Sequence, residues 1–136
     1  MAHWLFKSEP SSWSWDQMVE AGAKGTSWNG VRNHLAKKYM EAMAVGDLGF
    51  FYHSNEGKAV VGIVEVIRTY YPDPKDASGR FGMVDVRSVR PLKTAVTLDA
   101  IKVAPGLADM ALVKNSRLSV QPVTDAEWAL VCRLGG

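Results

Sequence analysis

The pattern of apolar and polar positions along the chain predicts five β-strands. Residues 48–53, 60–71 and 83–92 are rich in β-branched and aromatic residues, and turn-forming segments with Asn, Gly, Pro and Asp separate them. Residues 3–7 predict a first strand that ends before a proline, and residues 117–123 predict a last, short one. The long strands of the predicted sheet therefore come from the middle of the sequence.

The long central strand is predicted to be covered on both sides. Between residues 60 and 68 both alternating sets of side chains are largely apolar, which is typical of a strand buried on both faces. A small, closed or nearly closed barrel with a helix packed outside it would bury the strand in this way. In the next strand Val84 and Val86 face inward and the charged residues between and after them face outward. The alternation changes phase at Val89, which predicts a β-bulge.

Helical periodicity accompanies these strands. A capping-box spacing at residues 14–17 starts a short helix that runs towards Gly22, and apolar residues recur at three-to-four spacing from residue 31 to residue 43. Residues 97–103 predict one or two helical turns. A second capping box at residues 124–127 opens a closing helix. Its apolar side chains are predicted to form a lid over one barrel opening: Trp128, Leu130, Val131 and Leu134.

Length and composition predict one domain in a reducing compartment. The chain has 136 residues, of which 47% are hydrophobic and 22% charged, as in ordinary globular domains. The single cysteine, Cys132, excludes an internal disulfide and favours the cytoplasm. The N-terminal residues predict a strand and not a signal peptide, and no apolar stretch approaches the roughly 20 residues of a membrane span. We expect a soluble, monomeric, cytoplasmic protein.

The mild charge limits the kind of nucleic-acid contact that the chain can make. A net charge of +2 is too small for a broad surface that neutralises many phosphates, so a local basic groove or recognition of a base would be needed. Polar residues gather where predicted strands end, at residues 7–9, 32–33, 53–55 and 116–121. Such groups suit the edge of a base and its phosphate, although capping and turn hydrogen bonds explain many of them equally well.

No pattern in the sequence predicts a metal, a cofactor or a catalytic nucleophile. The three histidines fall on different predicted elements without ligand spacing, and Cys132 lies in an apolar helical stretch. Glu65 and Asp85 lie on neighbouring predicted strands and would make a carboxylate pair for acid–base chemistry. The simpler interpretation of Glu65 is a solvated residue on the sheet face.

Tryptophan is unusually dense, with five in the chain and four of them in its first quarter. Trp4 and Trp128 fit the packing of a strand and a helix. Residues 22–30 read as a loop that carries Trp28 between small polar residues, a setting for a partly exposed ring. Packing of the loop and stacking on a bound base are equally good interpretations of Trp28.

Four motifs, in order from end to end, resemble the EVE domain family. They are WLFKSEP at residues 4–10, WNGVRN at 28–33, FYHSN at 51–55 and SRLSVQPV at 116–123. The central strand at residues 60–66 also matches the family. The resemblance covers essentially the whole chain and implies a single EVE domain over residues 1–136. The implied fold is α+β and PUA-like: a small twisted barrel of five to six strands with peripheral helices, related to RNA-binding modules and YTH domains.

The resemblance further implies a non-catalytic domain that reads a modified base. The base, such as a modified cytosine or adenine of DNA or RNA, would be flipped into an aromatic pocket. The residues that the family motifs place around this pocket are Lys7, Ser8, Glu9, Trp28, Val31, Arg32, Asn33, Tyr52, His53, Ser54, Ser119, Val120 and Gln121.

Three alternatives stay open at this level. A structured-RNA-binding module would show strong salt dependence and little preference for a modified base. A hydrolase or nuclease acting on nucleotides would need a poised acid–base pair, for which only Lys7, Glu9 and His53 are candidates. A scaffold that binds a protein partner would have no ligand pocket at all.

Overall fold

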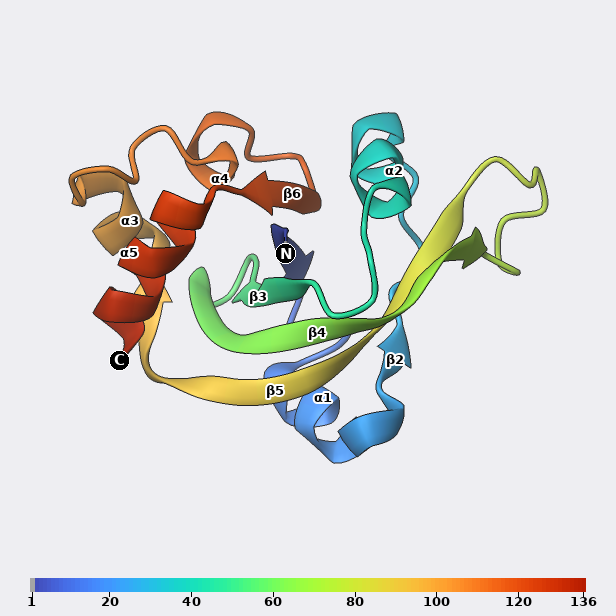
Figure 1. Cartoon of the computed structure of the whole chain (residues 1–136), viewed down its shortest axis with the longest axis horizontal. Coiled ribbons are helices and arrows are strands. Elements are labelled where there is room, and N and C mark those ends of the chain that lie inside the picture. The colour runs from blue at the N-terminus through green and yellow to red at the C-terminus, as the bar shows by residue number, and fades with distance from the viewer. Residues whose placement is uncertain (1) are drawn as a thin grey trace.

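The computed structural model describes residues 2–136 and shows a mixed sheet of six strands flanked by short helices (Figure 1). The strands follow the order β2-β5-β4-β3-β1-β6 across the sheet. The strands are β1 (His3–Ser8), β2 (Thr26–Ser27), β3 (Leu48–His53), β4 (Ala59–Pro72), β5 (Gly82–Thr97) and β6 (Val120–Val123). The helices are α1 (Trp15–Ala21), a 3₁₀ turn η1 (Gly22–Lys24), α2 (His34–Glu41), α3 (Leu98–Val103), α4 (Ala111–Lys114) and α5 (Asp125–Gly135).

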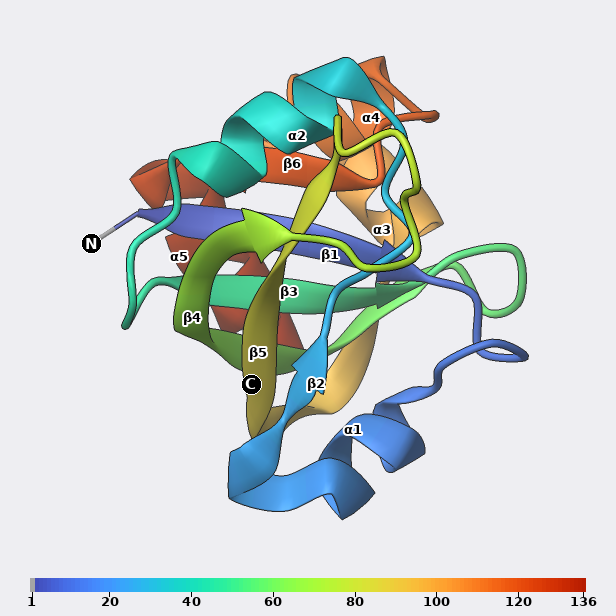
Figure 2. The same cartoon turned by 90° about the vertical axis from the view of Figure 1, so that its right-hand side faces the viewer.

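The sheet is strongly curved, and its pairing is mostly antiparallel. Only β1 and β3 run parallel, while β4 and β5 form the long bent hairpin that curls around the molecule (Figures 1 and 2). Ile63 pairs with Arg90 and Val64 with Ser88, which leaves Val89 as an extra residue and confirms the predicted bulge. The strand order ends at β2 and β6, so the structure shows a curved mixed sheet and barrel closure stays a prediction.

Two hydrophobic cores lie against opposite sides of the central strands. Successive side chains of a strand point to opposite faces, so Phe50 and Phe51 of β3 enter different cores. We call the first the Trp28 core; it includes Trp4, Phe6, Trp15, Met18, Trp28, Val31, Ala36, Met40, Phe51, Val64, Val66, Val84, Val86 and Val120. The second, the Trp128 core, includes Leu5, Phe50, Tyr52, Val60, Ile63, Ile101, Leu107, Leu112 and Val131, with Trp128 packed against them. Double-sided burial of the central strand is thereby confirmed.

The helix ends follow their capping residues. Ser14 and Thr124 both make the capping boxes that the sequence predicts. The second helix begins at His34 and not at residue 31, because Asn33 accepts a hydrogen bond from the backbone N–H of Ala36 at 2.9 Å and caps it. Val31 precedes this cap and is buried in the Trp28 core instead.

Several predicted boundaries were wrong where pairing, and not local pattern, decides the structure. Residues 22–30 contain η1 and the two-residue strand β2, which pairs with β5. Strand β5, predicted to end at residue 92, continues to Thr97 because β4 pairs with it there. Strand β6, predicted to begin at residue 117, begins only at Val120. The short helix α4 carries no pattern that predicts it.

The closing helix α5 packs on the Trp128 core. The lid over a barrel opening stays a prediction, because the strand order shows no closed barrel. Trp128, Leu130 and Val131 pack on this core as predicted, whereas Leu134 is 48% exposed and was assigned wrongly. Leu134 lies in the last turn of the helix, where the neighbouring Gly135 is the buried residue. None of the helices in residues 2–136 is long and apolar enough to cross a membrane.

Candidate functional site

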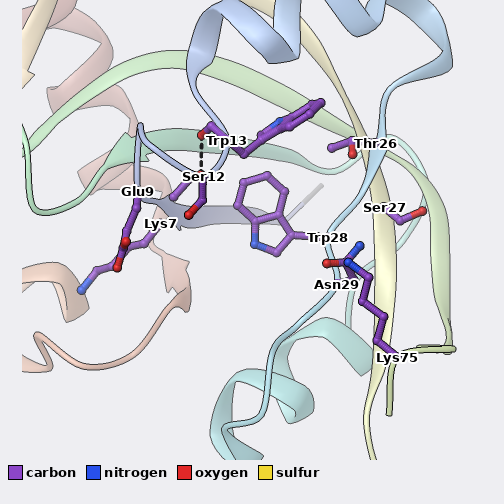
Figure 3. A pocket seen from close by; sticks show the side chains of 10 residues that line it. Lys7, Glu9, Ser12, Trp13, Thr26, Ser27, Trp28, Asn29 and Lys75 are labelled. Carbon is purple, nitrogen blue, oxygen red and sulfur yellow. Dashed lines mark hydrogen bonds between the residues drawn. The ribbon is translucent and has the colours of Figure 1, made fainter. Parts of the chain in front are cut away.

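A cavity of about 510 Å³ opens where β1 ends, within the size range of small-ligand sites. The end of β1, the turn after it, β2 with the residue pair that follows, and the loop between β4 and β5 contribute to its wall. The lining residues are Lys7, Ser8, Glu9, Ser12, Trp13, Thr26, Ser27, Trp28, Asn29 and Lys75. Figure 3 shows the Trp28 indole between an end formed by Lys7 and Glu9 and an end formed by Asn29 and Lys75.

The turn after β1 fixes one wall of the cavity. The carbonyl oxygen of Glu9 accepts hydrogen bonds from the backbone N–H groups of Ser12 and Trp13, both at 2.9 Å. The Ser8 hydroxyl donates to the carbonyl oxygen of Trp13 at 2.5 Å. These bonds hold Trp13 against the cavity, and its indole Nε1 is buried without a hydrogen-bond partner among residues 2–136.

Trp28 is part of the core and of the cavity wall at the same time. Its backbone N–H donates to the carbonyl oxygen of Val84 at 2.7 Å, and its ring meets Phe6 and Phe51 edge-on at 5.2 and 5.8 Å between centroids. The residue is only 8% exposed, so the prediction of a partly exposed ring was wrong. The pairing of β2 with β5, which the sequence does not reveal, draws Trp28 onto the core.

A buried carboxylate, Asp73, ties the Trp28 segment to the β4–β5 loop. One of its oxygens accepts from the Gly30 N–H at 2.9 Å and from Arg32 Nη1 at 3.0 Å, and the other accepts from the Lys75 N–H at 2.8 Å. Burial alone would raise the pKa of Asp73, but the hydrogen bonds from Gly30, Lys75 and Arg32 outweigh it and hold the pKa below its ordinary value. Asp73 is thus a buried negative charge that holds the Trp28 segment and the β4–β5 loop together.

A lysine lies at each end of the cavity, and Glu9 shares the end of Lys7 (Figure 3). Lys75 lies at one end, and at the other Lys7 Nζ donates to the carbonyl oxygen of Ser116 at 2.7 Å. Burial lowers the pKa of Lys7. A cavity with indole walls and ammonium groups at both ends can hold a flat ring and an attached anionic group.

Of the predicted site residues, Lys7, Ser8, Glu9 and Trp28 line this cavity. Arg32 lies beside it, paired with Asp73, and Asn33 is occupied as the cap of α2. Val31 and Val120 belong to the Trp28 core beneath the site. The structure therefore groups the first motif and the loop tryptophan around one cavity, and Val31 and Val120 pack in the core behind Trp28.

The β3 residues are placed differently. The side chain of Tyr52 lies in the Trp128 core, where burial and then the charge of Asp99 raise its pKa. His53 accepts a hydrogen bond at Nε2 from the backbone N–H of Trp15 at 3.1 Å, and burial, which outweighs the opposing effect of Asp16, lowers the pKa of the imidazole. Ser54 contributes its N–H to the carbonyl oxygen of Ser8 at 2.9 Å.

The last motif supports β1 from its other side. The carbonyl oxygen of Ser119 accepts from the backbone N–H of Lys7 at 2.9 Å. Gln121 is fully buried and donates from Nε2 to the carbonyl oxygen of Leu118 at 2.8 Å, while its Oε1 has no partner in the described part of the chain. These residues fix the end of β1 without lining the cavity.

Other lining residues were not predicted by the sequence. The density of tryptophan near the N-terminus was a usable signal for Trp13, and the polar neighbours of Trp28 were one for Ser27 and Asn29. Lys75 carries no signal, because only the fold of the β4–β5 hairpin brings it to the cavity.

The possible carboxylate pair on the sheet has separate partners. Glu65 Oε1 lies 2.6 Å from Arg87 Nη2, and Asp85 accepts a short hydrogen bond of 2.5 Å from the Tyr71 hydroxyl. Within residues 2–136 no group of His, Cys, Asp and Glu side chains is arranged to hold a metal ion.

The strands and helices together form a small α+β domain with a PUA/YTH-like fold. A YTH domain from Zygosaccharomyces rouxii shares this fold at a TM-score of 0.59 and 17% identity, covering 98% of this chain and 83% of that one. The family model described as "EVE domain" matches residues 2–134, and the chain belongs to the EVE domain family.

Relatives and solved structures agree with this membership. Human thymocyte nuclear protein 1 is 32% identical over 98% of this chain and 73% of its own length. An NMR structure of a Rhodopseudomonas palustris protein has a TM-score of 0.95 and 65% identity, covering 100% of this chain and 94% of that one. A crystal structure of human THYN1 protein in complex with 5-methylcytosine-containing DNA has a TM-score of 0.91 and 30% identity, covering 99% and 98%.

Proposed function

We propose that this protein binds DNA that carries a modified base and holds that base, turned out of the helix, in the cavity beside Trp28. The observation that carries the proposal is the cavity itself, with two indole groups in its wall and a lysine at each end. The human relative in complex with 5-methylcytosine-containing DNA supports a modified cytosine as the first candidate.

The cavity supplies the kinds of contact that an extrahelical base requires. Trp13 and Trp28 provide apolar surface for the ring, and stacking on an aromatic side chain stabilises a bound base by about 1–3 kcal/mol. Ser12, Asn29 and Glu9 offer polar groups to the edge of the base. Lys7 and Lys75 lie where phosphates on either side of the base would pass.

We propose binding without catalysis. Of the ionisable groups that a hydrolase would use, Lys7 donates to Ser116 and the ring nitrogen Nε2 of His53 accepts from Trp15. Both groups are engaged with the backbone, which suits positioning better than proton transfer. Absence of product after prolonged incubation with labelled modified DNA is the expected result.

The mild net charge supports recognition of one base over tight coverage of the backbone. With a net charge of +2, we expect few phosphate contacts and a shallow dependence of affinity on salt. A steep salt dependence with no preference for a modified base would instead indicate a structured-RNA-binding module.

The proposal is tested by measuring affinity for matched oligonucleotides that contain cytosine, 5-methylcytosine, 5-hydroxymethylcytosine or N6-methyladenine. Each is offered as DNA and as RNA at physiological salt, and the dissociation constants are compared. Preference for a modified base in DNA is expected. Equal affinity for all of them, or no binding, would contradict the proposal.

Loss of function at the cavity is best tested with Trp28→Phe. Trp28→Ala would confuse binding with unfolding, because Trp28 packs against Phe6 and Phe51.

A second pair of variants tests the positive charge at the cavity. Lys75→Gln removes an ammonium group from the cavity, and its matched control, Lys102→Gln, removes one from α3 on the Trp128 side. Only the Lys75 variant is expected to weaken DNA binding.

A further inference from the structure

The polar groups of the cavity differ sharply in what they can exchange with a base. The ammonium groups of Lys7 and Lys75 can only donate hydrogen bonds, whereas hydroxyl and amide groups can donate or accept. Among the described residues that line the cavity, Glu9 carries the only carboxylate, which can only accept. Glu9 is therefore the one lining side chain that can only accept hydrogen bonds and so requires a donor group on the ligand.

The backbone of Glu9 is held while its carboxylate stays available. Its carbonyl oxygen accepts from Ser12 and Trp13, which fixes the position of the residue at the cavity end. The carboxylate itself makes no hydrogen bond or ion pair with the other residues of the 2–136 range. The ammonium of Lys7 at the same end of the cavity donates to Ser116 and forms no ion pair with Glu9.

The bases differ in the group that would meet this carboxylate. Cytosine carries an exocyclic amino group at C4, which donates, whereas thymine and uracil carry a carbonyl oxygen there; adenine likewise presents an amino group at its Watson–Crick edge. A carboxylate pairs with the first group and repels the second. 5-Methylcytosine and thymine carry the same methyl group, so apolar contacts with the tryptophans cannot distinguish them.

We propose that Glu9 is the residue that selects an amino base: it accepts a hydrogen bond from the exocyclic amino group and rejects thymine and uracil. The inference rests on the proposed function and names the chemical class of its ligand. The tryptophan walls then sense the ring and its methyl group, and Glu9 senses the amino group.

The test compares 5-methylcytosine with thymine at one position of a DNA duplex. Each base is placed opposite an abasic site, so that the cost of turning it out does not depend on a partner base. The wild-type protein is expected to bind the 5-methylcytosine duplex at least about tenfold more tightly, the usual size of discrimination by one well-placed polar contact.

Glu9→Gln is expected to bring this ratio close to one, because an amide can pair with either an amino or a carbonyl group. Glu20→Gln is the matched control: it removes the same charge from an exposed position on α1 and should keep the ratio. Thermal unfolding of both variants checks the fold. Glu9→Asp, which keeps the carboxylate, should retain part of the preference.

The outcomes separate the inference from the proposed function. Wild-type preference for 5-methylcytosine over cytosine, combined with an unchanged 5-methylcytosine to thymine ratio in Glu9→Gln, would overturn the role of Glu9 alone. A wild-type protein that shows no preference among cytosine, 5-methylcytosine and thymine would overturn the proposed function. A ratio that collapses in Glu9→Gln and persists in Glu20→Gln supports the inference.

Discussion

Trp28 and Trp128 lie on opposite sides of the sheet, in different surroundings. On one side Trp128 of α5 stacks flat on Phe50 at 4.0 Å and on His3 at 4.2 Å and stays partly buried at the edge of its core. On the other side Trp28 meets Phe51 edge-on at 5.8 Å, and a cavity remains beside it. Neighbouring residues of one strand thus build a filled core and an open site.

The difference lies in which segments of the chain pack beside each tryptophan. The C-terminal helices pack apolar side chains on the sheet on the Trp128 side, and the ring of Trp128 rests on this packed surface. Around Trp28 the chain supplies a turn, a two-residue strand and a hairpin loop, which are held by hydrogen bonds to Glu9 and Asp73 rather than by bulky side chains. An aromatic pair therefore indicates a binding site only where the surrounding chain leaves room.

The largest expected effect is on stability, from truncation of either phenylalanine of β3. Phe50→Ala and Phe51→Ala should each lower the free energy of unfolding by about 3–5 kcal/mol, because both side chains are fully buried. Urea denaturation measures the loss. In the folded protein only Phe51→Ala should also weaken DNA binding. An equal loss of binding in Phe50→Ala would show that the two cores are not independent.

The next effect distinguishes the two tryptophans by binding. Trp28→Phe should weaken affinity for modified DNA about threefold to tenfold, a part of the 1–3 kcal/mol that base stacking contributes. Trp128→Phe should leave the affinity unchanged, since this ring stacks on Phe50 on the side of the sheet away from the cavity. Titration of both variants with the same oligonucleotide is the measurement. The comparison fails if the Trp128 variant loses as much affinity as the Trp28 variant.

A loss of stability smaller than that of the phenylalanine variants is expected from Asp73, the buried carboxylate that holds the Trp28 segment to the β4–β5 loop. Asp73→Asn should cost about 1–3 kcal/mol of unfolding free energy, because hydrogen bonds to a buried charge are lost. Glu65→Gln breaks a partly exposed ion pair with Arg87 and should cost about 0–1 kcal/mol. Chemical denaturation ranks the two. The reverse ranking would contradict the role assigned to Asp73.

The smallest expected effect is a loss of stability in acid that comes from Asp76, in the loop between β4 and β5. The Ser78 hydroxyl, aided by backbone N–H groups of Phe81 and Ser78 and against the opposing effect of burial, lowers the pKa of Asp76 to about 2. Its folded pKa lies below the unfolded one, so this stabilisation is present above about pH 4 and is lost as the pH falls towards 2.

Asp76→Asn should therefore show a shallower fall of melting temperature between pH 4 and 2 than the wild type. Melting temperatures at half-unit steps provide the comparison. Identical pH profiles for the two proteins would show that the Asp76 hydrogen bonds do not form in solution.

The sequence predicted the elements whose signal is local. Alternation identified the long strands, phase change located the bulge at Val89, and Ser14 and Thr124 located two helix starts. The family motifs added Lys7, Ser8, Glu9 and Trp28 to the candidate site, and these residues meet at the cavity.

What the sequence could not supply depends on contacts between distant segments. The pairing of Thr26–Ser27 with β5 buries Trp28, and no local pattern in a two-residue strand predicts it. Asp73 and Lys75 look like ordinary turn residues until the hairpin places them beside Gly30 and Arg32. Leu134 continues the apolar pattern of its helix, yet it stays 48% exposed.

The most direct test of a base in the Trp28 cavity is the response of the five tryptophan indole N–H signals in an NMR titration with 5-methylcytosine-containing DNA. The signals of Trp28 and Trp13 should move as DNA is added, and that of Trp128 should stay in place. Movement of the Trp128 signal with Trp28 and Trp13 unchanged would contradict the proposed site.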